Sequence, residues 1–428
     1  MTYQNALKYL DSLINYEKKR FIKYNDTNFN LNKLIKISQR LKLNNKNIKI
    51  FHIAGSNGKG SITTMIYTLL INNGYRAGLF ISPHIINIRE RIQANGKFIS
   101  KKDFAKCIAK IKALIKKFKY NLTFFEIITF AAMFFFKKIN CEYICLETGL
   151  GGRLDSTNIF NTNVSIISSV TLEHTDKLGN TIEQIAFEKA GIIKKNTPVI
   201  VGNIDQSALK IIEKIADEKN SKLYKFGIDI NATNIHLEIN KTFFKYHPNN
   251  TDIEIPLCGI NNPQNASIAL FALKLLKINI KPIFSNINLP ARFSIINKDP
   301  LVILDGSHNS EASKILSQTI KIIFNEKKVC FILGFLKDKN FKCFIDNILS
   351  QSLSIDVVKI NHFYDNSYNV YEYVKKIFIN SNYFKNNIEL IKYIKQNKDK
   401  IFIITGSFYL CSAILKNKSL FEKNNLKK

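Results

Sequence analysis

The 428-residue sequence has no tryptophan, only 17 glycines and 8 prolines, and seven arginines among its 63 basic residues. So little Gly and Pro excludes collagen-like and low-complexity chains. A hydrophobic fraction of 46% with 22% charged residues is typical of a folded globular protein and excludes wholesale disorder. At roughly 150 residues per domain, the length predicts two or three domains.

Zinc sites, disulfide frameworks and membrane spans are also disfavoured. The seven cysteines are odd in number and form no paired C-x-x-C motifs. No uncharged apolar run reaches the roughly 18 residues that a transmembrane helix needs, because the longest, residues 127–136, stops at Lys137. The N-terminal residues include an acid and polar side chains where a signal peptide has an apolar core. We therefore expect a soluble, cytoplasmic protein.

The net charge of +30 would ordinarily suggest a nucleic-acid partner. However, the lysines are scattered along the whole chain, as on a solvated surface, so we expect neither a nucleic-acid nor a membrane partner. The scarce residues are clustered instead. Glycines gather at residues 55–60 and 149–152, and four of the seven histidines, His52, His84, His174 and His308, lie in or beside glycine-containing loops or other motif segments. Such clustering indicates loops whose backbone conformation matters.

Short apolar runs alternate with helix-like stretches, which predicts βα units and mostly parallel sheets. The strands are expected at residues 48–53, 75–81, 142–147, 164–169, 198–201, 301–304, 329–333, 355–360 and 401–404. A proline-containing break at 288–300 is interpreted as a linker. The predicted fold is therefore α/β with two domains: residues 1–293, a P-loop-type domain with a mostly parallel sheet, and residues 294–428, a smaller Rossmann-like domain.

The strongest chemical signal is the segment AGSNGKGS at residues 54–61, which follows an apolar strand and opens a helix. Backbone N–H groups in such a turn and at the helix N-terminus point at phosphate oxygens. Lys59 adds a positive charge, and Ser61 can bind Mg²⁺ or phosphate. The spacing departs from the Walker pattern, because Gly60 separates Lys59 from Ser61.

Two further strand ends carry polar residues. Glu147 leaves a buried strand and enters a glycine-rich loop, and Glu173 and His174 follow the next strand. In open α/β sheets, ligands bind at the carboxyl ends of the strands, so Glu147 and His174 are candidates for metal or nucleotide contacts. The alternatives are a salt-bridge role for Glu147, a core imidazole for His174 and an ordinary salt-bridged helix residue for Lys189.

Taken together, these segments resemble the bifunctional folylpolyglutamate synthase and dihydrofolate synthase enzymes, distant relatives of the muramyl peptide ligases. The resemblance covers nearly the whole chain. It rests on AGSNGKGS (54–61), SPH (82–84), RERI (89–92), TFFE (123–126), LETGLGGRLDSTN (146–158), LEHTDKLGNTIEQIAFEKAGI (172–192), QNA (264–266), PARF (290–293), DGSHN (305–309) and TGS (405–407).

The resemblance implies roles for individual residues. ATP would be bound by Gly58, Lys59, Gly60, Ser61, Asn265, Arg292 and Asp305. One or two Mg²⁺ ions would be held by Ser82, Glu147, His174 and Lys189, the last as a carbamate. The pteroate side would be lined by Asn28, Phe29, Asn30, Thr123, Phe124, Phe125, Glu126, Arg153, Leu154 and Asp155. The catalytic groups would be Lys59, Lys189 and His308, with His308 near the phosphates.

The activity that the resemblance implies is an acid–amino-acid ligation. ATP phosphorylates a pteroate or folate carboxylate, and the amine of L-glutamate attacks the acyl phosphate. Dihydropteroate or a reduced folate would be the acceptor, and the chain would be a monomer. Alternatives are a dihydrofolate synthase alone, a muramyl-peptide-type ligase and a basic nucleic-acid-binding protein. Too few residues precede Gly55 for the additional domain of a muramyl ligase, and the last alternative leaves the glycine loops unexplained. Phe125 and Glu173 depart from the family pattern, which has Tyr and Asp there.

Overall fold

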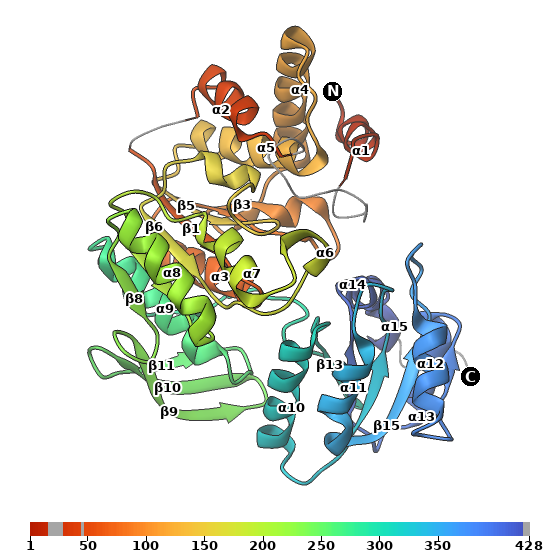
Figure 1. The fold of residues 1–428 in the computed structure, drawn as a ribbon. Helices are drawn as coiled ribbons and strands as arrows, with labels where there is room; N and C mark the ends of the chain where they lie inside the picture. Colours follow the sequence, from red (N-terminus) through yellow and green to blue (C-terminus); the bar gives the residue numbers. More distant parts are fainter. Residues whose placement is uncertain (16–28, 44–46, 423–428) are drawn as a thin grey trace. The chain divides into compact units, whose positions relative to one another are not determined.

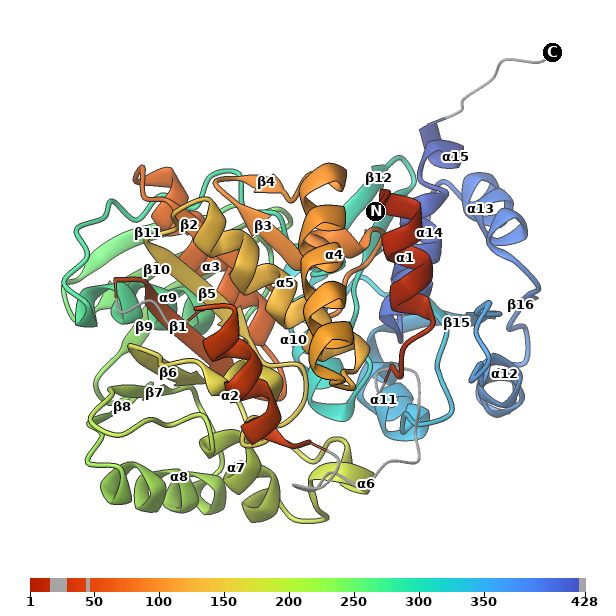
Figure 2. The ribbon, with the colours of Figure 1, turned by 90° about the horizontal axis from the view of Figure 1, so that it is seen from above.

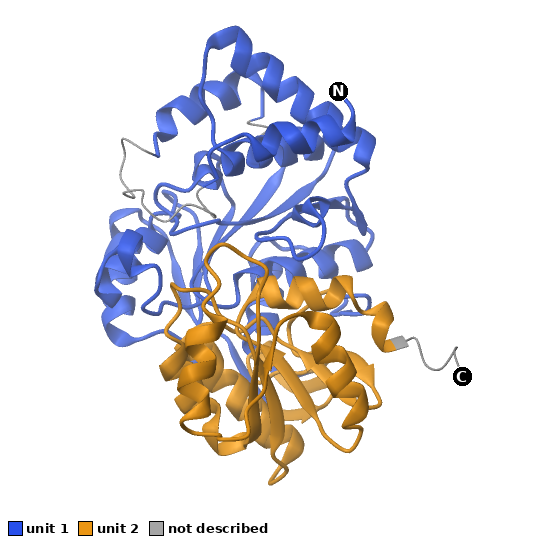
Figure 3. Cartoon of the chain, turned by 90° about the vertical axis from the view of Figure 1, so that its right-hand side faces the viewer, with its two compact units in different colours: residues 1–233, 246–251, 264–287 blue, residues 234–245, 252–263, 288–428 orange. Residues whose placement is uncertain are grey.

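The computed structural model describes residues 1–15, 29–43 and 47–422. The chain divides into two compact units, drawn in different colours in Figure 3. Unit 1 comprises residues 1–233, 246–251 and 264–287, and unit 2 comprises residues 234–245, 252–263 and 288–428. Among the described residues, no helix is both long and apolar enough to cross a membrane.

Unit 1 is built on an eight-stranded sheet with the order β4-β3-β2-β5-β1-β6-β7-β8. Its strands are β1 (Lys49–Ala54), β2 (Ala77–Phe80), β3 (Ile92–Ala94), β4 (Lys97–Phe98), β5 (Tyr143–Glu147), β6 (Val164–Ile167), β7 (Val199–Val201) and β8 (Leu223–Lys225). The run from β2 to β8 is parallel, and only β3 and β4 pair antiparallel. The parallel arrangement predicted for this domain is confirmed.

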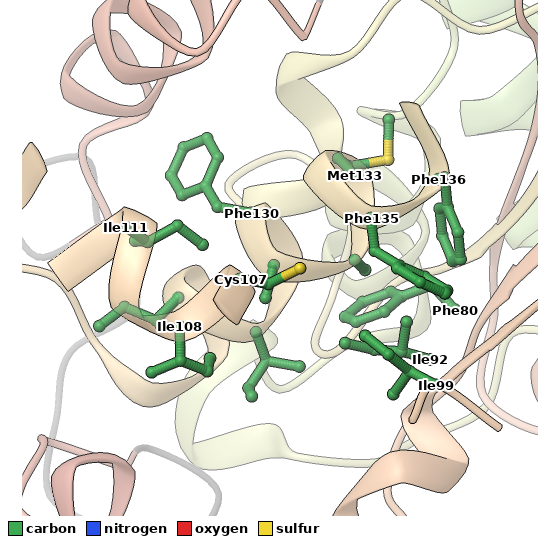
Figure 4. Packing of buried hydrophobic residues seen from close by; sticks show 14 of the residues in the cluster. Phe80, Ile92, Ile99, Cys107, Ile108, Ile111, Phe130, Met133, Phe135 and Phe136 are labelled. Atoms are coloured by element: carbon green, nitrogen blue, oxygen red, sulfur yellow. The ribbon is translucent and has the colours of Figure 1, made fainter. Parts of the chain in front are cut away.

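The sheet of unit 1 is covered by helices (Figures 1 and 2). They are α1 (Tyr3–Asp11), α2 (Leu31–Arg40), α3 (Lys59–Asn72), α4 (Lys101–Phe118), α5 (Phe124–Lys138), α6 (Thr175–Leu178), α7 (Ile182–Ala190), α8 (Gln206–Glu218) and α9 (Asn262–Leu275), with short 3-10 helices η1 (Ile88–Arg91) and η2 (Ser156–Ile159). Figure 4 shows part of the core that joins α4 and α5 to β2 and β3, including Phe80, Ile92, Phe130 and Phe136. A second cluster joins α6, α7 and α8 to β6 and β7.

A three-stranded sheet lies outside both predicted sheets. It has the order β11-β10-β9 and consists of β9 (Asn231–Glu238), β10 (Lys241–His247) and β11 (Thr251–Ile255), whose residues are divided between the two units. Its strands mix polar and apolar residues, and burial along β10 alternates residue by residue. We did not predict it, because continuous apolar runs identify buried parallel strands and not half-exposed ones.

Unit 2 contains a six-stranded sheet with the order β12-β13-β17-β14-β15-β16. Its strands are β12 (Ser294–Lys298), β13 (Leu301–Leu304), β14 (Val329–Leu333), β15 (Ser352–Val358), β16 (Tyr383–Phe384) and β17 (Phe402–Thr405). Its helices are α10 (Ser310–Phe324), α11 (Phe341–Ile348), α12 (Ser367–Lys375), α13 (Asn387–Gln396), α14 (Phe408–Lys416) and α15 (Ser419–Glu422), with the short 3-10 helix η3 (Leu349–Gln351). All strand pairs are parallel except β12 with β13.

The interpretation of residues 288–300 as a plain linker was wrong in part. Residues 294–298 form β12, which pairs antiparallel with β13 at the edge of the second sheet. Pro290 and Pro300 flank this strand and do not interrupt it, as expected for prolines around an edge strand. The predicted fold class, α/β with a mostly parallel first sheet and a second α/β domain, is confirmed.

Candidate active site

The phosphate loop, residues 55–61, leaves the end of β1 and enters α3. Gly55 has φ +146° and Gly58 has φ +83°, both conformations that favour glycine. Gly58 is the N-cap residue of α3 and Lys59 is its first residue. The free N–H groups of a 14-residue helix therefore open directly onto the loop, which is the geometry that binds phosphate.

Two serines at the end of β6 hold the phosphate loop in place. The Ser168 hydroxyl donates to Asn57 O at 2.6 Å and to Ala54 O at 3.3 Å. The Ser169 hydroxyl accepts from Asn57 N at 2.8 Å and donates to Asn57 O at 3.0 Å. Neither serine was among the residues predicted from the sequence. Their signal was the pair of small polar side chains that ends the strand expected at 164–169.

Lys59 and Asn265 lie at this loop, as expected. The Lys59 amine donates to Gly55 O at 2.6 Å and to Ser56 O at 3.0 Å. A Cβ atom built on Gly58 would lie 3.0 Å from Asn265 Oδ1, which places the start of α9 beside the loop. The structure therefore brings Gly58, Lys59, Gly60, Ser61 and Asn265 together.

The polar strand ends meet at one edge of the sheet. Strands β2, β5, β1 and β6 are neighbours, and their register aligns Phe80 with Leu146, Ile53 with Glu147 and Ala54 with Ile167. The segments that follow these strands are therefore adjacent at the carboxyl edge. They carry Ser82, Glu147, the phosphate loop and His174, which immediately precedes α6 with φ +47°.

Glu147 is buried at this edge and points toward the phosphate loop. Its Oε2 atom accepts from Ser82 N at 2.9 Å. A Cβ atom built on Gly60 would lie 3.5 Å from Oε2 and 3.6 Å from Oε1, so only the absence of a side chain keeps this space open. Among the described residues, no group of three or more His, Cys, Asp or Glu side chains is placed to hold a metal. A carboxylate and a hydroxyl beside a phosphate site are nevertheless the hard oxygen donors that suit Mg²⁺.

Lys189 forms a buried ion pair with Glu173. The Lys189 amine, with a side chain that is only 1% exposed, donates to Glu173 Oε1 at 2.8 Å. Burial would raise the pKa of Glu173, but the charges of Lys189, Lys59 and His174 outweigh it and hold that pKa well below its usual range. Burial lowers the pKa of Lys189, against the opposing effect of Glu173, and the nearby charge of Lys59 lowers it further. The charge of the phosphate-loop lysine therefore acts on both members of the Lys189–Glu173 pair.

Replacing Lys189 with methionine should lower the free energy of unfolding by about 3–5 kcal/mol, because it leaves the Glu173 charge buried without its partner. The double variant Glu173→Gln/Lys189→Met should lose much less. Denaturant unfolding measures both. Lys138→Met is the matched control, since it breaks the Lys138–Asp103 pair, in which Lys138 is 46% exposed, and such pairs contribute below about 1 kcal/mol. Equal losses in Lys189→Met and Lys138→Met would contradict this assignment.

The TFFE segment begins α5. The Thr123 hydroxyl accepts from Glu126 N, and Glu126 Oε2 accepts from Thr123 N at 2.6 Å, which is a capping box. The other Glu126 oxygen pairs with Lys33 at 3.3 Å. Phe124 is buried, and the half-buried Phe125 ring would contact a Cβ on Gly149 at 2.6 Å. This packing brings TFFE next to the second glycine loop, residues 148–155.

In the second glycine loop, the three predicted residues, Arg153, Leu154 and Asp155, are packed or bonded to neighbouring groups of the protein. Arg153 forms a salt bridge with Glu188 at 3.0 Å, and its guanidinium lies 5.7 Å from the centre of the Phe187 ring. Leu154 is buried. Asp155 is also buried and accepts from the backbone N–H groups of Gly149 and Leu150 at 2.8 and 3.0 Å.

Three predicted residues lie together in unit 2. Asp305 follows β13 and accepts from Phe293 N and Ser307 N, both at 2.9 Å. The Arg292 guanidinium lies 4.9 Å from the centre of the Phe408 ring. The centre of the His308 ring lies 5.9 Å from the centre of the same phenylalanine ring. Phe408, which was not among the predicted residues, thus contacts both Arg292 and His308.

Comparisons with known proteins assign the chain to a family. A model for the Mur ligase middle domain matches residues 53–273, and a model for the dihydrofolate synthetase C-terminal domain matches residues 288–417. A dihydrofolate synthase/folylpolyglutamate synthase of Buchnera aphidicola from Schizaphis graminum is 33% identical, over 97% of this chain and 96% of the relative. The chain belongs to the dihydrofolate synthase/folylpolyglutamate synthase family.

Solved structures of the family share the fold. The folylpolyglutamate synthase of Thermotoga maritima has a TM-score of 0.84 and 28% identity, covering 99% of this chain and 98% of that one. The bifunctional enzyme of Yersinia pestis, crystallised with AMPPNP and a manganese ion, has a TM-score of 0.82 and 25% identity, covering 97% and 98%. The family resemblance inferred from the motifs is confirmed.

The other family segments lie as follows. Asn28 falls outside the described residues. Phe29 directly precedes Asn30, the N-cap of α2, whose side chain accepts from Lys33 N at 3.2 Å. In the SPH and RERI segments, Glu90 accepts from the N–H groups that follow His84, and the buried Arg91 donates to His84 Nδ1 at 2.9 Å. These contacts order the loop that begins at Ser82.

Proposed function

We propose that the chain is an ATP-dependent ligase that joins L-glutamate to the carboxyl group of dihydropteroate and of reduced folates. One observation carries the proposal: a glycine-rich phosphate loop lies beside the buried Glu147–Ser82 pair at the carboxyl edge of the sheet. The comparisons add that the relative from Buchnera bears both activities in its name over nearly the full length of both chains.

The chemistry follows from these groups. A carboxylate is a poor acyl donor, so its oxygen attacks the γ-phosphorus of ATP, ADP leaves, and an acyl phosphate results. The glutamate amine then attacks the acyl carbon, and phosphate leaves with formation of the amide. The N–H groups at the start of α3 and the Lys59 amine stabilise the charge on the transferring phosphoryl group. Mg²⁺, when bound, neutralises phosphate charge and orients the reacting oxygens.

The residue assignments belong to the same proposal. For metal binding we propose Ser82, Glu147 and His174, together with Lys189 once its amine is converted to a carbamate. For ATP we propose the phosphate loop with Asn265, Arg292 and Asp305. A related Yersinia structure contains AMPPNP and a manganese ion, and a folylpolyglutamate synthase of 25% identity and TM-score 0.83, covering 98% of this chain and all of that one, is a complex with AMPPCP and folate. The TFFE segment, beside the second glycine loop, would face the pteroate group.

We also propose a cytoplasmic, monomeric protein. The seven cysteines are all free and six of them are buried, which suits a reducing compartment. The ligation chemistry described above depends neither on the cytoplasmic location nor on the monomeric state.

The test is ATP-dependent phosphate release by the purified protein with L-glutamate and Mg²⁺, comparing dihydropteroate with a reduced folate. We expect turnover with both acceptors and none without glutamate. Turnover with dihydropteroate alone would restrict the function to dihydrofolate synthesis. Release with neither acceptor, from a protein that still binds ATP, would overturn the proposal.

A further inference from the structure

A chain of buried hydrogen bonds runs from the middle of the sheet to the second glycine loop. His52 lies in β1, fully buried, opposite Leu146 of β5 and Ser165 of β6. Its Nε2 atom lies 2.8 Å from the hydroxyl oxygen of Thr157, which is itself fully buried in η2. Thr157 donates its hydroxyl proton to Asp155 Oδ1 at 2.5 Å. The chemistry described above gives His52 and Thr157 no role.

The direction of these bonds fixes the state of the imidazole. A threonine hydroxyl has one proton, and Thr157 gives it to Asp155, so the hydroxyl must accept at the His52 contact. Nε2 therefore carries a proton. Burial and the charge of Lys194 lower the pKa of His52 well below its ordinary value, so the ring is neutral and Nδ1 is unprotonated. Among the described residues, Nδ1 has no hydrogen-bond partner, so the Thr157 bond is the one that the ring makes.

At its other end, the chain of hydrogen bonds reaches the second glycine loop through Asp155. Asp155 accepts at both oxygens: Oδ1 from the N–H and hydroxyl of Thr157, and Oδ2 from the N–H groups of Gly149 and Leu150. Gly149 packs directly against the Phe125 ring, where no side chain would fit. The Asp155 carboxylate thus holds Gly149, the loop residue that packs against TFFE.

A second buried contact holds Arg153 of the same loop. The Asn158 amide group donates to Arg153 O and to Gly191 O, both at 2.9 Å. The Lys194 amine donates to Asn158 O and Oδ1, both at 2.6 Å. Asn158 follows Thr157 in η2, so one short helix connects both anchors, and a shift of Thr157 would move Gly149, Leu150 and Arg153 together.

We propose that His52 and Thr157 are positioning residues for the second glycine loop, and through it for the pteroate or folate acceptor. The part that concerns the acceptor rests on the proposed function. Both residues are buried beneath the loop and act through Asp155. They should therefore govern acceptor binding and leave ATP binding, which uses the other loop, nearly unchanged.

The test uses Thr157→Val, which removes the hydroxyl at nearly constant volume, with Thr157→Ser as the rescue variant. Ser165→Ala is the matched control, because this buried hydroxyl next to His52 donates to Ile192 O and lies outside the chain of bonds. We expect Thr157→Val to raise the KM for the acceptor about tenfold, as the loss of a buried hydrogen bond implies, with the KM for ATP changed less than about twofold. Thr157→Ser and Ser165→Ala should behave as wild type.

His52→Phe should raise the acceptor KM similarly, and the double variant His52→Phe/Thr157→Val should be no worse than either single one, because both break the same chain. Hydrogen exchange gives a readout that needs no turnover. The amide protons of Gly149 and Leu150 should exchange about tenfold faster in Thr157→Val, while those of β1 do not change.

The outcomes separate the two proposals. If wild type turns over and Thr157→Val keeps the wild-type acceptor KM and amide protection, the positioning role is wrong. If wild type turns over with neither acceptor, the proposed function fails, and amide exchange alone decides: faster exchange at Gly149 and Leu150 supports the loop-positioning role, and unchanged exchange overturns it.

Discussion

Replacing Glu147 with glutamine is expected to lower kcat for ATP-dependent ligation about a hundredfold, because a catalytic metal contributes several kcal/mol and about 1.4 kcal/mol is a factor of ten. The glutamine oxygen can still accept from Ser82 N, which Glu147 now does at 2.9 Å, so the local fold is retained and only the charge is lost. Steady-state phosphate release measures the rate, and Mn²⁺ titration in the presence of AMPPNP measures the affinity for metal.

Glu142→Gln is the matched control for this change. Glu142 immediately precedes β5, whereas Glu147 ends it, and Glu142 pairs with Arg76 at the opposite, amino end of the strand. Its side chain is 45% exposed, so its loss should change neither the rate nor the metal affinity. If Glu147→Gln bound Mn²⁺ as tightly as wild type, the proposed metal role of Glu147 would be wrong whatever the rate.

The sequence was sufficient to predict which polar strand ends meet at one edge of the sheet. Apolar runs that end in polar residues mark buried parallel strands, and parallel strands place their carboxyl ends at one edge of the sheet. Glu147, His174 and the phosphate loop could therefore be expected at the same edge. The order of the strands could not be predicted this way. That β5 lies between β2 and β1, and so brings Glu147 to Ser82, depends on pairing between distant segments.

Partners that are distant in the sequence were missed for the same reason. Lys189 was selected as a metal ligand, but its contact with Glu173 depends on how α7 packs beside the end of β6. His52 was noted only for its place beside a glycine loop, and its bond to Thr157 spans 105 residues. Local pattern reports which residues are buried or at a strand end, whereas tertiary packing decides which polar groups meet.

Gly55→Ala should have the second large effect, because the phosphate loop touches the end of β6 at this residue. A Cβ atom there would lie 2.0 Å from Ser168 Oγ and 3.0 Å from Ser169 N, and φ is +146°. Overpacking of this kind costs about 1–3 kcal/mol of stability. The clash must also shift the loop away from the position in which it binds phosphate. We therefore expect the affinity for ATP to fall at least about a hundredfold. Denaturant unfolding and nucleotide titration measure the two effects.

Gly74→Ala separates the clash from the backbone strain. Gly74 lies just beyond the end of α3 with φ +82°, and a Cβ there would meet nothing within 4 Å, so its cost of about 1 kcal/mol reflects the left-handed conformation alone. Its nucleotide affinity should be that of wild type. Ser168→Ala added to Gly55→Ala removes the atom that clashes, and it should recover part of the stability. It should recover little of the ATP affinity, because the Ser168 hydroxyl is also one of the two that hold Asn57 and the loop in place. Full recovery of ATP binding in that double variant would show that the loop keeps its shape without this serine.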